Sequence, residues 1–188
     1  MDSKISVLLL VRPAEGGIRK HVQTLLRGLN SDRYDIAVAC PPGSPLFEEC
    51  HSLGWRVFPV DLAGDVSLLQ DFRSVLEVRR ALKSVRPEIL HMHGMKAALV
   101  GRTAVSIGRR PKTLITCHSF VLDERSGPVK RKCAALLELF LQPVTDKMIC
   151  VSEALKTHMV HDLRVPAHKI AVIPNGIRFN ELLKPKRD

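Results

Sequence analysis

Short apolar runs alternate with helical segments along the whole chain, and this alternation constrains the fold more than any other feature. Each run has the length of a strand and few polar residues, as expected of strands buried on both faces. The alternation predicts an α/β fold: a Rossmann-like, doubly wound, mostly parallel sheet of about seven strands with helices on both faces. The predicted strands are 5–11, 34–40, 56–60, 89–92, 113–117, 147–151 and 169–173.

The segments between these runs carry apolar residues three and four positions apart, which is the period of an amphipathic helix. Such stripes begin at Ile18, Leu68 and Leu99. A short helix is expected after Ser44-Pro45, and another begins at Ser152-Glu153, directly behind a strand.

The chain has 188 residues, a formal net charge of +10 and only 4% aromatic residues. This length predicts one domain with a substantial core. The positive charge favours anionic partners such as phosphates or acidic lipids. No nucleic acid is expected as a partner, because aromatic residues do not alternate with the basic ones as a base-stacking surface requires.

Five cysteines lie far apart in the sequence, and their number is odd. Three of them lie within or at the end of strand-like runs, which predicts buried, reduced thiols and not a disulfide framework. The apolar run at the start of the chain is followed by no signal-peptide cleavage pattern. We therefore expect a cytoplasmic protein.

Ligands of a doubly wound sheet bind outside the carboxyl ends of its strands, and this rule selects the candidate residues. Gly16-Gly17 follows the first strand and opens a helix. Two interpretations remain open at this point: the glycines let a phosphate approach backbone N–H groups at the helix N-terminus, or they only form a tight turn.

Histidines follow two of the other strands. His118 follows the fifth, where it either forms a structural hydrogen bond or contacts a substrate hydroxyl or developing charge. His91 and His93 share a face if their strand extends that far, which raises the question of a metal site. Cys117 and His118 are the candidates for a further ligand, but adjacent strand residues point to opposite faces of a sheet. We therefore expect no metal, with His91 packed inside and His93-Gly94 lining the crevice.

The segment 127–146 predicts an unusual helix, apolar nearly all round in its middle and basic in its first turn through Lys130, Arg131 and Lys132. An anionic membrane surface is one explanation for the basic residues. A buried helix with a solvated basic end is the other, and the width of the apolar surface favours it.

Five segments, in this order, resemble the N-terminal domain of retaining GT-B glycosyltransferases of the family-4 type. They are "EGGIRKHVQTLLRGL", "PEILHMHGMKAALVGRTA", "TLITCHSF", "DKMICVSEALKTHMV" and "HKIAVIPNGI", and together they span nearly the whole chain. The resemblance implies transfer of a sugar from a nucleotide-sugar donor to a hydroxyl acceptor with retention. It implies no cofactor and no metal, and its members include enzymes that act on lipid-linked acceptors at membranes.

The resemblance also implies roles for individual residues. His118 is expected beside the transferred sugar as an orienting and charge-stabilising catalytic group, with Ser119 nearby. Pro174, Asn175 and Gly176 are expected to form the crossover into a second domain. The expected donor-phosphate and acceptor-binding residues are Glu15, Gly16, Gly17, His93, Gly94, Lys96, Ser119, Ser152 and Glu153.

One departure from the family pattern is large. The E-x7-E pair of the family's donor-binding domain does not occur in the sequence, which ends eleven residues after Ile177. The expected division is an N-terminal, acceptor-side domain over 1–177 and an interdomain linker or chain end over 178–188, without the donor-binding domain. This part alone is expected to be inactive. The alternative is a stand-alone, non-catalytic module that binds a phosphorylated sugar or assists a separate catalytic subunit. If the protein acts on lipid-linked acceptors, peripheral attachment at the inner face of the membrane is expected.

Overall fold

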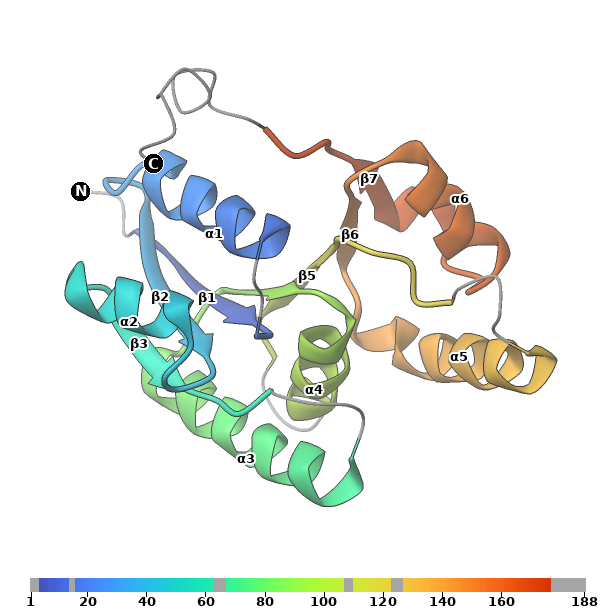
Figure 1. Ribbon diagram of the computed structural model, residues 1–188, viewed down its shortest axis with the longest axis horizontal. Coiled ribbons are helices and arrows are strands. Elements are labelled where there is room, and N and C mark those ends of the chain that lie inside the picture. Colours follow the sequence, from blue (N-terminus) through green and yellow to red (C-terminus); the bar gives the residue numbers. More distant parts are fainter. Residues whose placement is uncertain (1–3, 14–15, 63–66, 107–109, 123–126, 177–188) are drawn as a thin grey trace, which may run out of the picture.

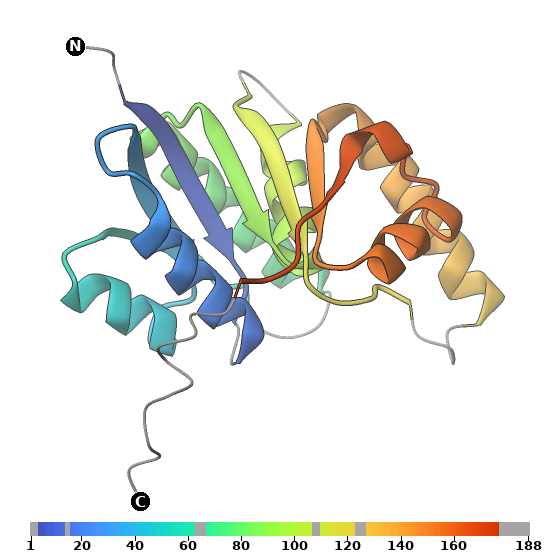
Figure 2. The same cartoon turned by 90° about the horizontal axis from the view of Figure 1, so that it is seen from above.

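The chain forms a three-layer α/β domain, seen in a computed structural model that describes residues 4–13, 16–62, 67–106, 110–122 and 127–176 (Figures 1 and 2). The seven-stranded sheet has the order β3-β2-β1-β4-β5-β6-β7, and every neighbouring pair is parallel. The predicted doubly wound fold is therefore confirmed. The strands are β1 Ile5–Val11, β2 Tyr34–Cys40, β3 Arg56–Pro59, β4 Ile89–His93, β5 Lys112–Cys117, β6 Lys147–Cys150 and β7 Ile170–Val172.

Helices cover both faces of the sheet, as predicted (Figure 1). The buried side chains of α1 and α2 pack on one face, whereas those of α3, α4 and α6 pack on the other. Each predicted stripe or start signal corresponds to a helix. The helices are α1 Gly17–Gly28, α2 Pro45–Ser52, α3 Leu68–Val85, α4 Met95–Val105, α5 Pro128–Leu141 and α6 Glu153–His161.

The central strand β1 contributes to the hydrophobic core on both faces of the sheet, because its side chains alternate between the two faces. Leu8 and Leu10 belong to the cluster on the α3 and α4 side, whereas Leu9 and Val11 belong to the cluster beneath α1 and α2. All four side chains are fully buried. Burial on two faces explains why β1 reads as a continuous apolar run.

The cysteine prediction is right for four residues and wrong for one. Cys40, Cys50, Cys117 and Cys150 are buried free thiols, whereas Cys133 is an exposed free thiol on α5. Cys133 is exposed because α5 turns it away from the sheet. Among the described segments, every helix is too short or too polar to cross a bilayer.

A buried ion pair attaches α5 to α4. Arg102 on α4 donates two hydrogen bonds to the Glu138 carboxylate on α5, with N···O distances of 2.7 and 2.9 Å. The two side chains are only 2% and 3% exposed, and Thr145 accepts a further hydrogen bond from Arg102. A bidentate, charge-assisted pair of this kind fixes the distance and the rotation of α5.

The favoured interpretation of 127–146 as a buried helix is wrong. Only Glu138 and Leu141 of α5 are buried, whereas Val129, Leu136 and Phe140 are 75%, 55% and 83% exposed. The physical reason is that the Arg102–Glu138 pair fixes the rotation of α5 so that Ala134, Glu138 and Leu141 face inward. The larger apolar side chains are thereby left in solvent.

Removing one partner of the pair should destabilise the fold strongly. Glu138→Ala leaves the Arg102 charge buried without its carboxylate, and we expect a loss of about 3–5 kcal/mol in the free energy of unfolding, measured by urea denaturation. The double variant Arg102→Met, Glu138→Leu serves as control, because it removes both charges together. It should lie within about 1 kcal/mol of the original chain. A loss below about 1 kcal/mol in Glu138→Ala would contradict this account.

Candidate active site

The carboxyl ends of β1 and β4 lie side by side where the strand order reverses, which is the position for a ligand site in a doubly wound sheet. Val11 at the end of β1 pairs with His93, and His93 pairs in turn with Thr116 near the end of β5. Residues about eighty positions apart in the sequence are thereby brought to one edge of the sheet.

Gly16 and Gly17 form the turn from β1 into α1. Gly16 has a φ of 78°, a conformation that residues with a Cβ rarely adopt, so the turn requires glycine at this position. The space beside Gly17 is open. Among the described residues, no side chain caps α1 and no acidic residue lies in its first turn, so the backbone N–H groups face the edge of the sheet.

Gly94 repeats this arrangement at the start of α4. Its φ is 86°, and no described side chain caps the helix. A Cβ at Gly94 would lie 3.0 Å from Cδ of Arg12, which shows how closely the Arg12 side chain lies against this turn. Two helix N-termini and one guanidinium group therefore meet at the same edge, a combination that favours an anion.

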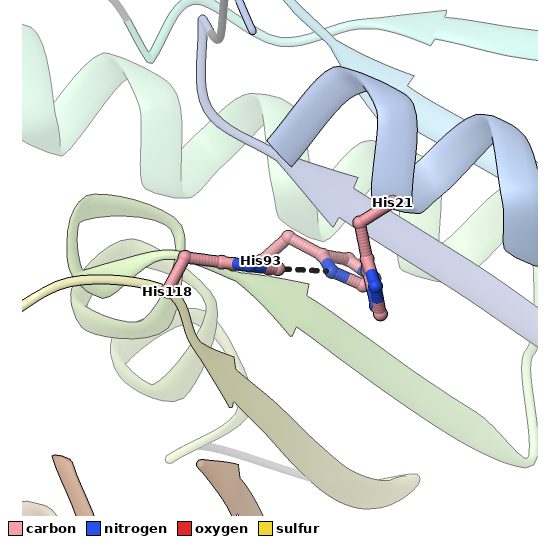
Figure 3. A group of neighbouring side chains, drawn as sticks. All are labelled: His21, His93 and His118. Carbon is pink, nitrogen blue, oxygen red and sulfur yellow. Dashed lines mark hydrogen bonds between the residues drawn. The ribbon is translucent and has the colours of Figure 1, made fainter. Parts of the chain in front are cut away.

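Three imidazole rings from different elements gather between these turns (Figure 3). His93 ends β4 and is fully buried, His118 follows β5 and is half-buried, and His21 lies one turn into α1. Nδ1 of His93 lies 3.4 Å from Nε2 of His118. The His21 ring centroid is 5.6 Å from that of His93 and 5.0 Å from that of His118. We call these three residues the histidine cluster.

A fourth histidine supports the cluster from below. The rings of His91 and His93 are 4.1 Å apart, so the two do share one face of β4 as expected. Nε2 of His91 lies 2.8 Å from the Thr116 hydroxyl, which holds its ring. His91 is packed inside, as expected, but His93 is also fully buried. His93 therefore forms the floor beneath His118 and does not line an open crevice.

All four imidazoles are held in the neutral form at neutral pH. Burial lowers the pKa of His91 to about 3, and the nearby His21 and His118 act in the same direction. Burial lowers the pKa of His118 to about 4, with His21 and Arg12 contributing. Burial likewise lowers the pKa values of His93 and His21.

The segment after β7 returns to this site. The Asn175 side chain lies close enough to His21 to raise its pKa against the effect of burial, and Pro174, Asn175 and Gly176 are exposed. Figure 2 shows this segment running from β7 back across the edge of the sheet toward α1. The predicted crossover segment thus contacts the histidine cluster. Residues 177–188 lie outside the described residues, as does Glu15.

The remaining predicted residues differ in their placement. Ser119 is exposed beside His118. The Ser152 hydroxyl caps α6 by accepting from the Leu155 N–H, and Glu153 is an exposed first-turn residue. Lys96 forms an ion pair of 2.5 Å with Asp71 on α3, and its side chain is only 8% exposed. Lys96 therefore joins α4 to α3, and its ammonium group is not presented to the edge.

His21 is a residue of the candidate site that the sequence analysis missed. It lies four residues after Gly17, hence on the same helix face one turn further along, and this spacing was the available signal. A separate cavity of about 560 Å³ lies among Arg86, Glu88 and Arg110 at the opposite ends of the strands. Its position excludes it from the site described here.

Comparison with known proteins agrees with this architecture. Residues 15–181 match the profile of Glycosyltransferase Family 4, and the chain belongs to this family. It is 28% identical over 180 residues to an Escherichia coli UDP-Gal:alpha-D-GlcNAc-diphosphoundecaprenol alpha-1,3-galactosyltransferase, covering 93% of this chain and 46% of that enzyme. It is 26% identical over 165 residues to the Staphylococcus aureus capsular polysaccharide biosynthesis glycosyltransferase CapM, covering 84% and 42% of the two chains.

A solved structure shows the same fold. Anabaena Alr3699/HepE in complex with UDP and glucose aligns with a TM-score of 0.72 at 19% identity, covering 94% of this chain and 46% of that one. The resemblance to a GT-B, family-4-type glycosyltransferase domain is therefore confirmed. The chain spans about half the length of the curated relatives that it matches.

The buried histidines should make the fold sensitive to acid. His91 titrates at about 3 in the folded chain and near its usual 6.5 when unfolded, so the unfolded chain binds more protons below pH 6.5. The free energy of unfolding should therefore fall with pH below about 6.5, by up to about 1.4 kcal/mol per pH unit for each such histidine. Urea denaturation at about pH 7.5 and about pH 5.5 measures this fall.

Two variants separate the buried histidine from exposed ones. His91→Gln cannot be protonated and should reduce the pH dependence by the share of one histidine, whereas His161→Gln at an exposed position should leave it unchanged. Equal stabilities at both pH values in the original chain would show that the cluster is not buried in neutral form.

Proposed function

We propose that this domain is the acceptor-side half of a retaining glycosyltransferase that transfers a sugar from a nucleotide-sugar donor to a hydroxyl group. One observation carries the proposal: in a family-4 chain, two glycine-started helices and the histidine cluster converge at the switch point of the sheet. Support also comes from the relatives, whose names include a UDP-galactose-dependent transferase and a UDP-bound structure.

In this proposal the glycine turns bind the charged part of the donor. The donor diphosphate lies against the N–H groups at Gly16 and Gly17, where the dipole of α1 favours negative charge. The start of α4 at Gly94, with Arg12 against it, provides a second positive region for the leaving diphosphate. Glycine at positions 16 and 94 adds no side chain to these turns, and the space beside Gly16 is open.

His118 contacts the transferred sugar in this proposal. Its pKa of about 4 keeps the ring neutral at neutral pH. Because Nε2 faces His93, Nδ1 is the ring nitrogen left for a sugar hydroxyl. The rate enhancement then comes from stabilising the charge of the leaving diphosphate, with no protein nucleophile and no metal required. His93 sets the position of the His118 ring from below.

In this proposal the acceptor binds at the same edge of the sheet, near the ends of β5 and β6. Exposed Ser119 lies beside His118, and Ser152 with Glu153 opens α6 at the end of β6. Lys96 is assigned a positioning role, since its ion pair with Asp71 holds the start of α4 against α3.

The donor-binding half is proposed to follow this domain. The matched relatives are about twice as long, and 174–176 lies where a crossover would leave the domain. The proposed division is residues 1–177 for this domain and 178–188 for the linker. The coding sequence beyond residue 188 tests this division: a second α/β domain with an E-x7-E pair is expected, and a native stop codon would support a stand-alone module.

A lipid-linked acceptor and a membrane surface form the second part of the proposal. Val129, Cys133, Leu136 and Phe140 recur every three or four residues and share the outward side of α5, flanked by Lys130 and Lys132. An exposed apolar stripe bordered by lysines fits the interface of an anionic bilayer. One relative acts on a diphosphoundecaprenol-linked sugar, which supports such an acceptor here.

Replacing His118 should impair transfer without unfolding the domain. In the complete enzyme that contains this domain, we expect His118→Ala to lower turnover with a nucleotide-sugar donor at least about tenfold, equivalent to about 1.4 kcal/mol in the barrier. The measurement is initial rates together with thermal unfolding. His161→Ala, at an exposed position on α6, is the control and should retain full turnover. Unchanged turnover in His118→Ala would remove His118 from the reaction.

Membrane binding should depend on the apolar stripe of α5. Burying one Phe side chain is worth about 1.5–3 kcal/mol, so Phe140→Glu should weaken binding to phosphatidylglycerol vesicles at least about tenfold in co-sedimentation. Leu53→Glu is the matched control, because Leu53 is also exposed, at 62%, but lies at the end of α2. Equal loss in both variants, or binding equal to neutral phosphatidylcholine vesicles, would contradict the membrane assignment.

A further inference from the structure

We propose that His21, His93 and His118 form a binding site for one transition-metal ion of the zinc class. The three residues each offer one ring nitrogen, and these atoms all lie within 4.8 Å of one another. Metal binding itself does not depend on the proposed sugar transfer. Among the described residues, no other group of three histidine, cysteine or acidic side chains meets this spacing.

The distance between His93 and His118 fits a shared ion better than a hydrogen bond. Their facing nitrogens are 3.4 Å apart, whereas hydrogen bonds from N–H groups centre near 2.9–3.0 Å. Two nitrogens bound tetrahedrally to one Zn²⁺ at about 2.0–2.1 Å are about 3.3–3.4 Å apart. Neither ring therefore has to move far from the other to share an ion.

The third ligand comes from helix α1. His93 is fully buried on a central strand and His118 is half-buried, whereas His21 is a half-buried side chain on α1. Its ring has to approach by at most about 1.5 Å to complete a tetrahedral set with N···N spacings of about 3.3 Å, because the three nitrogens lie within 4.8 Å of one another. The Asn175 side chain lies beside the His21 ring, and neighbouring polar groups commonly orient metal-binding histidines.

The surroundings select the class of metal. The three ligands are imidazoles without a carboxylate, and Arg12 lies near enough to His118 to oppose a cation. Mg²⁺ and Ca²⁺ prefer oxygen ligands and depend on negative charge, so this site disfavours them. Zn²⁺, Co²⁺, Ni²⁺ and Cu²⁺ form strong bonds to neutral imidazole. Three protein ligands leave a fourth position for water.

Metal binding would compete with the role proposed for His118. A metal ion bound at Nε2 of His118 leaves the ring proton on Nδ1, which then cannot accept a hydrogen bond from a sugar hydroxyl. Zn²⁺ should therefore inhibit transfer. This consequence, unlike the binding site, rests on the proposed function.

Titration of the chain with Co²⁺ and Zn²⁺ tests the site directly. A Cys133→Ser background removes the exposed thiol, which otherwise offers a competing ligand. We expect one Co²⁺ per chain with the visible absorption of a tetrahedral ion, displaced by one equivalent of Zn²⁺, and no binding of Mg²⁺. Calorimetry gives the Zn²⁺ affinity and stoichiometry without any activity assay.

Variants identify the ligands. His21→Ala and His118→Ala should each weaken Zn²⁺ binding at least about tenfold, since each removes one of three ligands. His161→Ala and His168→Ala, at exposed positions, should bind as before. Circular dichroism confirms folding, and His21→Ala remains informative if the buried His93→Ala fails to fold. Equal affinity in His21→Ala and His161→Ala, or no saturable binding in the original chain, would overturn the proposal.

Discussion

The parallel pairing of β4 with β1 and β5 is the constraint on which the site depends. It places Val11 beside His93 and His93 beside Thr116, so that the turns after three strands open at one edge. Because the backbone ladder fixes this register, the imidazole of His93 has no freedom to leave the floor of the site. Gly16 and Gly94 then begin two helices at positive φ without obstructing the space above it.

The electrostatics around the histidine cluster favours a negatively charged ligand. Helix N-termini, Arg12 and neutral imidazoles are present, and the described side chains of the histidine cluster include no carboxylate. A site of this kind attracts a negatively charged group and keeps its histidines unprotonated until an anion arrives. The same neutral imidazoles are good ligands for a transition metal, which is why one cluster supports both inferences.

The position of α5 against α4 is fixed by a single buried ion pair. Arg102 and Glu138 orient α5 from within the core, so the apolar residues of that helix face outward. An apolar helix surface in solvent is unfavourable by itself, and such surfaces commonly mark a protein or membrane interaction site. The lysines that flank the stripe are suited to an anionic membrane surface, which is also where the proposed lipid-linked acceptor would reside.

The sequence by itself determined the fold class, the strand and helix boundaries to within a few residues, and the glycine turn before α1. It could do so because burial on two faces and helical periodicity are local patterns that each segment carries alone. Tertiary structure alone decided that His21 joins His93 and His118, that Lys96 turns to Asp71, and that α5 is exposed. Each of these depends on which distant side chain lies opposite, and a periodic pattern contains no information about a partner on another element.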